Sequence, residues 1–419
     1  MRFLLDTEQR AFADSLGALL KAADTPSVVR DWSRGDPASG RALWRRLAEA
    51  GVFALAVPEA LGGLGPRPVE LAVAFVELGR HAVPGPLVET ATAAALLSEA
   101  AAAARPPETT TAARPPEATT AALLPEATSR ATPAEGPPAP PPVTPGEQHP
   151  RQPAGPDERR HPQPAGPEGR RPRRPGASEG QSLRQPGTPG GRRPPRPVVP
   201  SAHPQALLTA LLRGSALATL APEGSCALDG DTADILLSLT GDGLRLAPGH
   251  GPVRASLDPA RRRTSLAGGG ALLGTGIRPA RALPLARLTT AAQALGVGEA
   301  LLDRTLAHVR QRTQFGVPVG SFQAVGHRLA DAKLALEFAR PLVFGAALTL
   351  GEADVAAAKA SACEAAYATA RTALQCHGAI GYTAEYDLSL WLTRARALRG
   401  AWGDPDTCRA AVLDAAGRA

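Results

Sequence analysis

The chain has 419 residues, of which 43 are Pro and 43 are Gly, while aromatic residues make up only 4%. Residues 101–200 hold 26 of the prolines and contain no Phe, Trp or Tyr. A segment of that composition has too little apolar surface to offset the entropy of ordering it, which excludes it as a folded core. The rest of the chain is long enough for two or three packed units.

The net charge of +7 is concentrated in the same segment. Residues 101–200 contain 14 Arg against nine acidic residues, so the remainder of the chain is close to neutral. A nucleic-acid-binding protein would be expected to carry a basic patch on its folded part. The charge distribution therefore argues against nucleic acid as a partner.

The cysteines and the N-terminal sequence bear on metal binding and location. The four cysteines are widely spaced and form no CxxC pair, so structural zinc is not expected. The first 20 residues carry acids where a secretory signal would have a basic region, and no run of 18 apolar residues follows. These features predict a soluble, cytoplasmic protein with no membrane partner.

Residues 1–100 show the three- and four-residue apolar spacing of helices. Asp6 or Thr7 can cap a first helix that runs through Leu20. Further helical runs occupy 44–51, 69–79 and 87–100. This part is predicted to be an N-terminal helical domain.

Residues 101–204 are of low complexity, with imperfect repeats such as ARPPE at 104–108 and 113–117. We interpret the segment as a disordered, partly polyproline II insertion. An alternative is a docking site for a polyproline-binding partner.

The pattern changes twice more along the chain. Residues 205–275 contain short apolar runs at 216–220, 233–239 and 244–246, which predict strands and a hairpin. Residues 280–419 are predicted to be helical, because apolar stripes with 3,4 spacing follow one another from Pro284 onward. Their lengths and order favour an antiparallel bundle of four helices.

Two stretches carry a specific resemblance to a known family. RQRTQFGVPVGSFQAVGHRLAD at 310–331 and QCHGAIGYTAEYDLSLWLTRARAL at 375–398 resemble segments of the acyl-CoA dehydrogenase family, and LWRRLAEAGVFALAVPEALGGLG at 43–65 agrees. The resemblance implies a fold that is mainly α with a small β domain. In this fold an N-terminal helical domain, a short β-barrel-like middle unit and a C-terminal four-helix bundle follow one another, interrupted here by the insertion.

Residues around the first turn of the predicted bundle are candidates for cofactor binding. Arg312, Gln314 and Phe315 surround a Gly turn, and Gln323 follows at the start of the next helix. A cation, amides and an aromatic face at helix ends suit a phosphoanhydride and a stacked ring, although an exposed Arg cap is the plainer reading. The resemblance implies that Arg312, Phe315 and Gln323 contact the pyrophosphate and adenosine end of FAD across a subunit boundary.

A second cofactor-binding candidate is the loop that begins at Gln375 and contains Gly378 and Ala379. Glycine lets the backbone approach a ligand closely, although Gly378 is also explained by a helix C-cap. By resemblance, this loop holds the FAD of the neighbouring protomer. Ala379 departs from the family, which commonly has a second Gly there.

The resemblance implies α,β-dehydrogenation of an acyl thioester, in which a carboxylate removes the α proton and a flavin accepts a hydride. In most members the base is a Glu that aligns, through Arg394, with Gly403. A minority place it at the position of Ala286, so both usual base positions lack a carboxylate. Asp404 is a candidate substitute, although it is shifted by one residue and reaches less far than Glu.

The middle unit is shorter than is usual in the family. Members with full activity carry Thr- and Ser-containing strand motifs that bind the flavin ring, and Thr219 and Ser225 are the candidates here. His327 and His377 are interpreted as structural.

Two hypotheses of different class follow from the resemblance. The first is an enzyme that oxidises an acyl-CoA with FAD and passes electrons to an electron-transfer flavoprotein. The second is a non-catalytic subunit that supplies FAD-binding loops to a catalytic partner. A homo- or hetero-tetramer is implied in either case.

Overall fold

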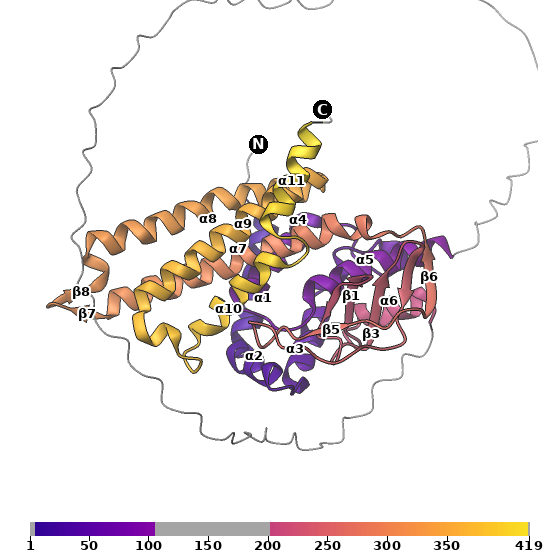
Figure 1. The fold of residues 1–419 in the computed structure, drawn as a ribbon, viewed down its shortest axis with the longest axis horizontal. Helices are drawn as coiled ribbons and strands as arrows, with labels where there is room; N and C mark the ends of the chain where they lie inside the picture. The colour runs from indigo at the N-terminus through magenta and orange to yellow at the C-terminus, as the bar shows by residue number, and fades with distance from the viewer. Residues whose placement is uncertain (1–4, 105–201, 418–419) are drawn as a thin grey trace, which may run out of the picture. The chain divides into compact units, whose positions relative to one another are not determined.

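The fold is described for residues 5–104 and 202–417, in a computed structural model. These residues form one unit (Figure 1). The insertion predicted over 101–204, and the alternative of a polyproline docking site, lie almost wholly outside the described residues.

The N-terminal domain is helical, as predicted. Its elements are α1 (Thr7–Ala22), α2 (Thr25–Ser33), α3 (Ala38–Glu49), the short 3-10 turns η1 (Val52–Ala54) and η2 (Glu59–Leu61), α4 (Pro68–Arg80) and α5 (Leu87–Ala103).

The start of α1 shows why the predicted cap forms. The Asp6 carboxylate accepts a hydrogen bond from the Gln9 backbone N at 2.8 Å, and the Gln9 side chain accepts one from the Asp6 N at 3.1 Å. This capping box confirms Asp6 as the cap.

The sequence analysis did not predict helix α2. Pro26 in the first turn of α2 is a signal for a helix start. Asp24 precedes the helix in a left-handed conformation, with φ 46°.

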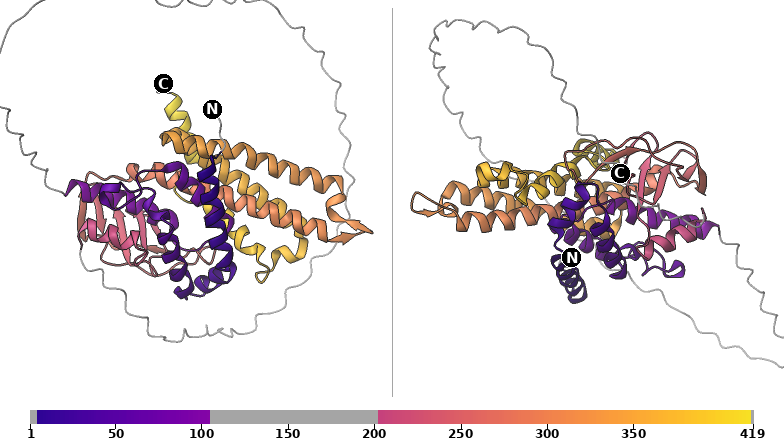
Figure 2. Two further views of the ribbon diagram at one scale, coloured as in Figure 1. Left: turned by 180° about the vertical axis from the view of Figure 1, so that it is seen from behind. Right: turned by 90° about the horizontal axis from the view of Figure 1, so that it is seen from below.

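The small β unit follows the helix α6 (Pro204–Leu212), which the sequence did not predict. Its strands are β1 (Ala218–Pro222), β2 (Cys226–Leu228), β3 (Ile235–Leu239), β4 (Gly243–Leu246), β5 (Arg263–Ser265) and β6 (Ala271–Thr275). They form an open four-stranded sheet of order β1-β3-β4-β6, in which β1 and β3 are parallel, and a separate β2-β5 ribbon. Side chains of α5 and α6 share one apolar core with the sheet, so both helices cover one of its faces (Figures 1 and 2).

The C-terminal domain contains the four predicted helices and one more. They are α7 (Pro279–Gln311), α8 (Gln323–Thr349), α9 (Glu352–His377), α10 (Leu388–Gly400) and α11 (Pro405–Ala416). A hairpin of β7 (Thr313–Gln314) and β8 (Val317–Pro318), followed by the turn η3 (Val319–Ser321), joins α7 to α8, and η4 (Gly378–Tyr382) follows α9. Helix α7 begins one residue before the predicted boundary at 280, and it contains Pro284, from which the apolar stripes were traced.

Two glycines fix the N-terminal helices against the bundle. A Cβ atom on Gly296 of α7 would lie 1.9 Å from the Val76 carbonyl oxygen of α4, and one on Gly79 would lie 2.1 Å from the Gln293 carbonyl oxygen. The two backbones are therefore in direct contact, which only Gly permits. Across the described helices, no stretch combines the length and apolarity needed to span a membrane.

Candidate active site

A cavity of about 820 Å³ opens where the β unit, α5 and the C-terminal helices meet. One wall comes from Glu89 of α5 and from β1 and β2, where Leu220 and Leu228 lie. The opposite wall comes from the start of α7, at Leu283 and Arg287, and from the loop that follows α10. The described lining is largely apolar, apart from a small number of charged side chains.

Glu89 is the carboxylate of the described lining. Glu89 is only 5% exposed, and its Oε1 accepts a hydrogen bond from the Trp402 indole Nε1 at 3.2 Å. Its Oε2 is buried without a hydrogen-bond partner among the residues that the structure describes. Burial raises the pKa of the Glu89 carboxyl, and the charge of Arg261, a hydrogen bond from the residue's own backbone and the Trp402 hydrogen bond offset part of that rise.

Arginines supply the positive charge of the cavity. Arg261 and Arg287 are buried, while Arg263 and Arg396 are exposed at the rim. Burial lowers the pKa of Arg261, which remains a cation in proteins. The Arg287 Nε lies 3.4 Å from the Trp402 carbonyl oxygen, and its Nη1 is buried with no partner in residues 5–104 or 202–417. Arg287 thus has a donor available to a ligand.

The loop between α10 and α11 is held in an unusual conformation. Trp402 has a φ of 55° and Gly403 a φ of 107°, and a left-handed conformation is costly for a bulky residue. The buried Lys359 holds this loop, because its ammonium donates to the Gly403 carbonyl oxygen and, at 3.2 Å, to the Arg399 carbonyl oxygen. Backbone strain of this kind persists only where the surroundings enforce it.

The two predicted base positions lie at or next to the cavity wall and carry no carboxylate. Gly403 is part of the cavity wall, and Ala286 is fully buried in α7 next to the wall residue Arg287. The candidate substitute Asp404 has another role, since its carboxylate caps α11 by accepting from the Thr407 N at 2.7 Å. That hydrogen bond lowers the pKa of the exposed Asp404 carboxyl. Asp404 is therefore explained by helix capping.

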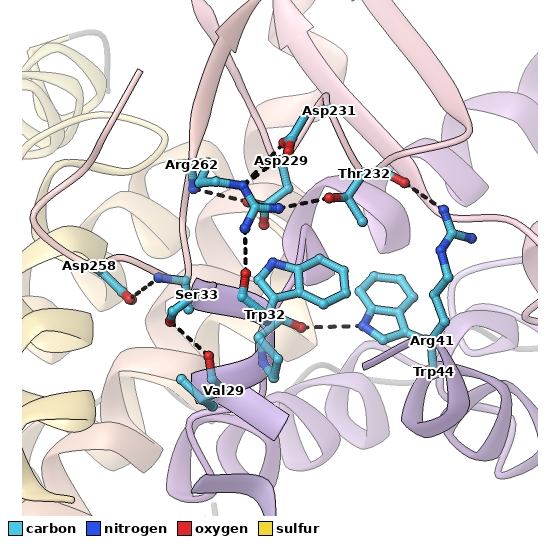
Figure 3. A network of polar contacts seen from close by, with 12 residues as sticks. Val29, Trp32, Ser33, Arg41, Trp44, Asp229, Asp231, Thr232, Asp258 and Arg262 are labelled. Carbon is cyan, nitrogen blue, oxygen red and sulfur yellow. Dashed lines mark hydrogen bonds and ion pairs between the residues drawn. The ribbon is translucent and has the colours of Figure 1, made fainter. Parts of the chain in front are cut away.

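A polar network anchors the segment that forms one side of the cavity (Figure 3). The Arg262 guanidinium donates to the Trp32 carbonyl oxygen at 2.5 Å and to the Thr232 hydroxyl at 2.7 Å, and it pairs with Asp231 at 3.2 Å. The buried Asp229 carboxylate accepts from the Arg262 backbone N at 2.9 Å. Burial raises the pKa of Asp229 to about 7, with the nearby Arg262 opposing the rise.

A buried ion pair holds the same segment to α10. The Arg394 Nε and the Asp258 Oδ2 are 2.5 Å apart, with side-chain exposures of 1% and 3%. Arg394 also donates to the Val83 carbonyl oxygen at 2.8 Å, just before α5. The loop that carries Arg261 is therefore fixed to both helical domains.

The predicted cofactor-binding residues lie at the far end of the bundle. The Arg312 Nη1 donates to the His377 carbonyl oxygen at 3.3 Å, so the hairpin and the loop after α9 are adjacent. Phe315 is 94% exposed at the tip of the hairpin, with φ 53°, and its ring meets the Phe322 ring edge-on at 6.1 Å. The remaining candidates are exposed or half-buried around them: Gln314, Gln323, Gln375, Gly378 and Ala379.

Other predicted residues have mixed outcomes. Ser225 lines the cavity at an exposed position, whereas Thr219 is buried on β1 and its hydroxyl has no partner in the described part of the chain. Glu299 of α7, a charged residue in a long helix, is only 9% exposed. It pairs with Arg80 at 2.6 Å and with Arg340.

Sequence reasoning missed the charged groups that line the cavity. Glu89 stands in a run of small and apolar residues, LVETATAAALLSEA, and nearly all of α5 is buried. A carboxylate in a helix that is apolar on every side is costly unless it has a function or a partner, and this was the available signal. Arg287 and Trp402 are sequence neighbours of the two empty base positions.

Comparisons with known proteins give matches over both helical domains. The family models described as acyl-CoA dehydrogenase N-terminal domain and C-terminal domain match residues 6–104 and 275–416. The curated acyl-CoA dehydrogenase IpdE2 of Mycobacterium tuberculosis is 26% identical over 400 residues, covering 93% of this chain and 91% of that protein. The short-chain-specific acyl-CoA dehydrogenase of Megasphaera elsdenii is 38% identical over 115 residues, 26% of this chain and 30% of that protein.

Solved structures show the same fold. The ChsE4-ChsE5 complex from Mycobacterium tuberculosis superposes with a TM-score of 0.66 at 20% identity, covering 100% of this chain and 98% of that one. Butyryl-CoA dehydrogenase from Megasphaera elsdenii superposes with a TM-score of 0.64 at 17% identity, with both chains fully covered.

Proposed function

The chain belongs to the acyl-CoA dehydrogenase family, and from that membership we propose that it takes part in the α,β-dehydrogenation of an acyl-CoA by FAD. The observation that carries the proposal is the cavity of about 820 Å³, whose buried carboxylate and arginines stand between apolar walls. FAD, when bound, supplies the acceptor for the hydride that leaves the acyl chain.

The residues of the cavity fit a flavin ring and an acyl thioester. Leu220, Leu228 and Leu283 offer apolar surface for a flat ring and an acyl chain. The unpartnered Arg287 Nη1 offers a buried donor to an electron-rich ligand atom, within the described part of the chain. We place the ring and the reacting carbons in this cavity.

The other cofactor-binding residues serve a neighbouring chain in this proposal. Arg287 at the cavity and Arg312 at the hairpin are 25 residues apart along α7, which corresponds to roughly 37 Å at 1.5 Å per residue. An extended FAD is shorter than that. The exposed Arg312 and Phe315 are therefore proposed to contact the FAD that occupies the cavity of another protomer.

Such sharing of the site requires an oligomer. We propose a homo- or hetero-tetramer with another acyl-CoA dehydrogenase subunit in the cytoplasm, and an electron-transfer flavoprotein as acceptor. A solved neighbour is itself a complex of two named chains, ChsE4 and ChsE5, which supports a mixed assembly.

A second candidate function is a non-catalytic subunit that completes the FAD site of a partner. It is favoured by Ala286 and Gly403, which leave both usual base positions without a carboxylate. The two functions differ in whether the cavity of this chain turns over substrate.

The first test is the visible spectrum of the purified protein and of its Arg312→Ala variant. Loss of a charge-assisted hydrogen bond is worth about 1.5–3 kcal/mol, so we expect FAD to be retained about 10- to 100-fold less tightly. Arg310→Ala, which removes an exposed charge at the end of the same helix, is the matched control and should retain FAD. Equal FAD affinity in the Arg312→Ala variant and the unmodified protein would contradict the assignment of the hairpin.

A further inference from the structure

We propose that Glu89 is the base that removes the α proton of the acyl thioester in the cavity of this chain. The proposal rests on the proposed function, since it assumes that FAD and an acyl-CoA occupy that cavity. It supplies from α5 the carboxylate that positions 286 and 403 lack.

The first argument is geometric. Within residues 5–104 and 202–417, Glu89 is the acidic side chain that lines the cavity. One carboxylate oxygen, Oε1, is fixed by the Trp402 indole at 3.2 Å, and the other, Oε2, has no partner in the same described residues. A base needs an oriented carboxylate with one oxygen that is not already engaged in a hydrogen bond.

The second argument is position. Trp402 immediately precedes Gly403, the empty base position, and both belong to the cavity wall. The residue that orients Glu89 therefore stands beside the place where the family carries its carboxylate. Trp402 adopts a left-handed conformation, at φ 55°, which is costly for a bulky residue, and its indole donates to Glu89 of α5.

The third argument is electrostatic. A structural carboxylate in a buried helix is normally neutralised by a direct ion pair. In the described ranges 5–104 and 202–417, no cation lies within 4.0 Å of Glu89, and Arg261 acts on it through space without a hydrogen bond. Burial raises the pKa of Glu89, which makes its carboxylate a stronger base than an exposed one.

The proposed step balances as follows. The proton of the Cα–H bond moves to Glu89 Oε2, and the electron pair of that bond forms the new carbon–carbon π bond. The Cβ–H bond breaks with departure of a hydride, which FAD accepts. The thioester is oxidised by two electrons, and FAD is reduced by two.

Glu89→Gln tests the proposal in the flavin-loaded assembly as purified. The amide keeps an oxygen for the Trp402 donor, so FAD content and the thermal midpoint should remain close to those of the unmodified protein. The probes are butyryl-, octanoyl- and hexadecanoyl-CoA, added without oxygen while flavin bleaching is followed. We expect the bleaching rate to fall by about a hundredfold or more, since a positioned base contributes roughly 10²–10⁴ in rate.

A second readout is exchange of the α hydrogen. In deuterated buffer the unmodified assembly should label the α carbon of the recovered probe, as measured by mass spectrometry, and Glu89→Gln should not. Glu89→Asp, which shortens the reach, should give an intermediate bleaching rate. This series separates the chemical role of the carboxylate from a role in packing alone.

Glu77→Gln is the matched control, because the pKa of Glu77 is also raised, mainly through burial, but this half-buried residue lies on α4 outside the described lining of the cavity. It should bleach at the normal rate. Bleaching and α exchange within threefold of normal in Glu89→Gln would overturn the proposal and leave the proposed function standing. An unmodified assembly that binds FAD and is reduced by none of the probes would instead overturn the proposed function, and this inference with it.

Discussion

The two ends of the C-terminal helical domain are built in opposite ways. At the cavity end, charged side chains are buried and fixed: Arg394 and Asp258 form a buried pair, and Lys359 holds the loop after α10. At the hairpin end, Phe315 is 94% exposed, and the Arg312 side chain makes a single hydrogen bond within the described part of the chain. The frame around the cavity is thus held by contacts within the chain, whereas the hairpin end offers groups to something outside it.

The difference shows where each end receives its stability. Buried charges at the cavity end contribute to a rigid frame, and removing one partner leaves the other uncompensated. Exposed groups at the hairpin end can change without loss of folding free energy, so a ligand or partner explains their chemistry better than packing does. Three substitutions break or sharpen this contrast.

The largest effect is expected from Asp258→Ala. It leaves the Arg394 guanidinium buried without its carboxylate, and such a loss costs about 3–5 kcal/mol of the free energy of unfolding. Chemical denaturation at neutral pH measures the change. The control is Glu337→Ala, which breaks an exposed pair with Lys333 on α8 and should cost less than about 1 kcal/mol. Similar losses in both variants would show that the cavity end is no more rigid than the surface.

Asp229→Asn sharpens the contrast through pH. The pKa of Asp229 is raised to about 7 in the folded chain, above its ordinary 3.8, so folding favours the protonated form. Its contribution to stability is therefore complete below pH 3.8 and is lost as the pH rises through 7. Between pH 5 and pH 8 the loss should be about 2–3 kcal/mol, at 1.36 kcal/mol per pKa unit.

The Asn variant should lose this part of the pH dependence, because the amide oxygen can still accept from the Arg262 backbone N. Unfolding free energies of both proteins at pH 5 and pH 8 provide the measurement. Burial also raises the pKa of Glu77 and Glu89, so the comparison uses the difference between the two proteins. Parallel pH profiles would contradict the prediction.

The sequence predicted the parts of the fold that rest on local signals. The cap at Asp6, the helical runs that became α4 and α5, and the runs that became β1, β3 and β4 were all recognisable from spacing and turn residues. The short helices α2, α6 and α11 were missed, because nine to twelve residues give a periodic pattern too little length to stand out.

The cavity was harder to predict than the fold. The cavity brings together residues from parts of the chain that are far apart in sequence: Glu89, Arg287 and Trp402. A local sequence pattern cannot predict that such residues are neighbours in the fold. Asp404 was a candidate because it lies next to Gly403 in sequence, but its carboxylate caps the start of α11. The hairpin residues were found through a motif, and a motif does not show that they lie at the opposite end of α7 from the cavity.

The smallest effect on stability is expected from Phe315→Ala at the hairpin tip. The ring is 94% exposed, so the free energy of unfolding should change by less than about 0.5 kcal/mol. Retention of FAD should fall about tenfold if the ring stacks on the adenine of a cofactor bound to a neighbouring protomer, because stacking of a base on an aromatic side chain is worth about 1–3 kcal/mol. Leu413→Ala, at a residue that is 71% exposed on α11, controls for loss of an exposed apolar group and should change neither quantity. A Phe315→Ala protein that is destabilised yet keeps FAD would reverse the contrast between the two ends, since the hairpin would then serve packing and not the cofactor.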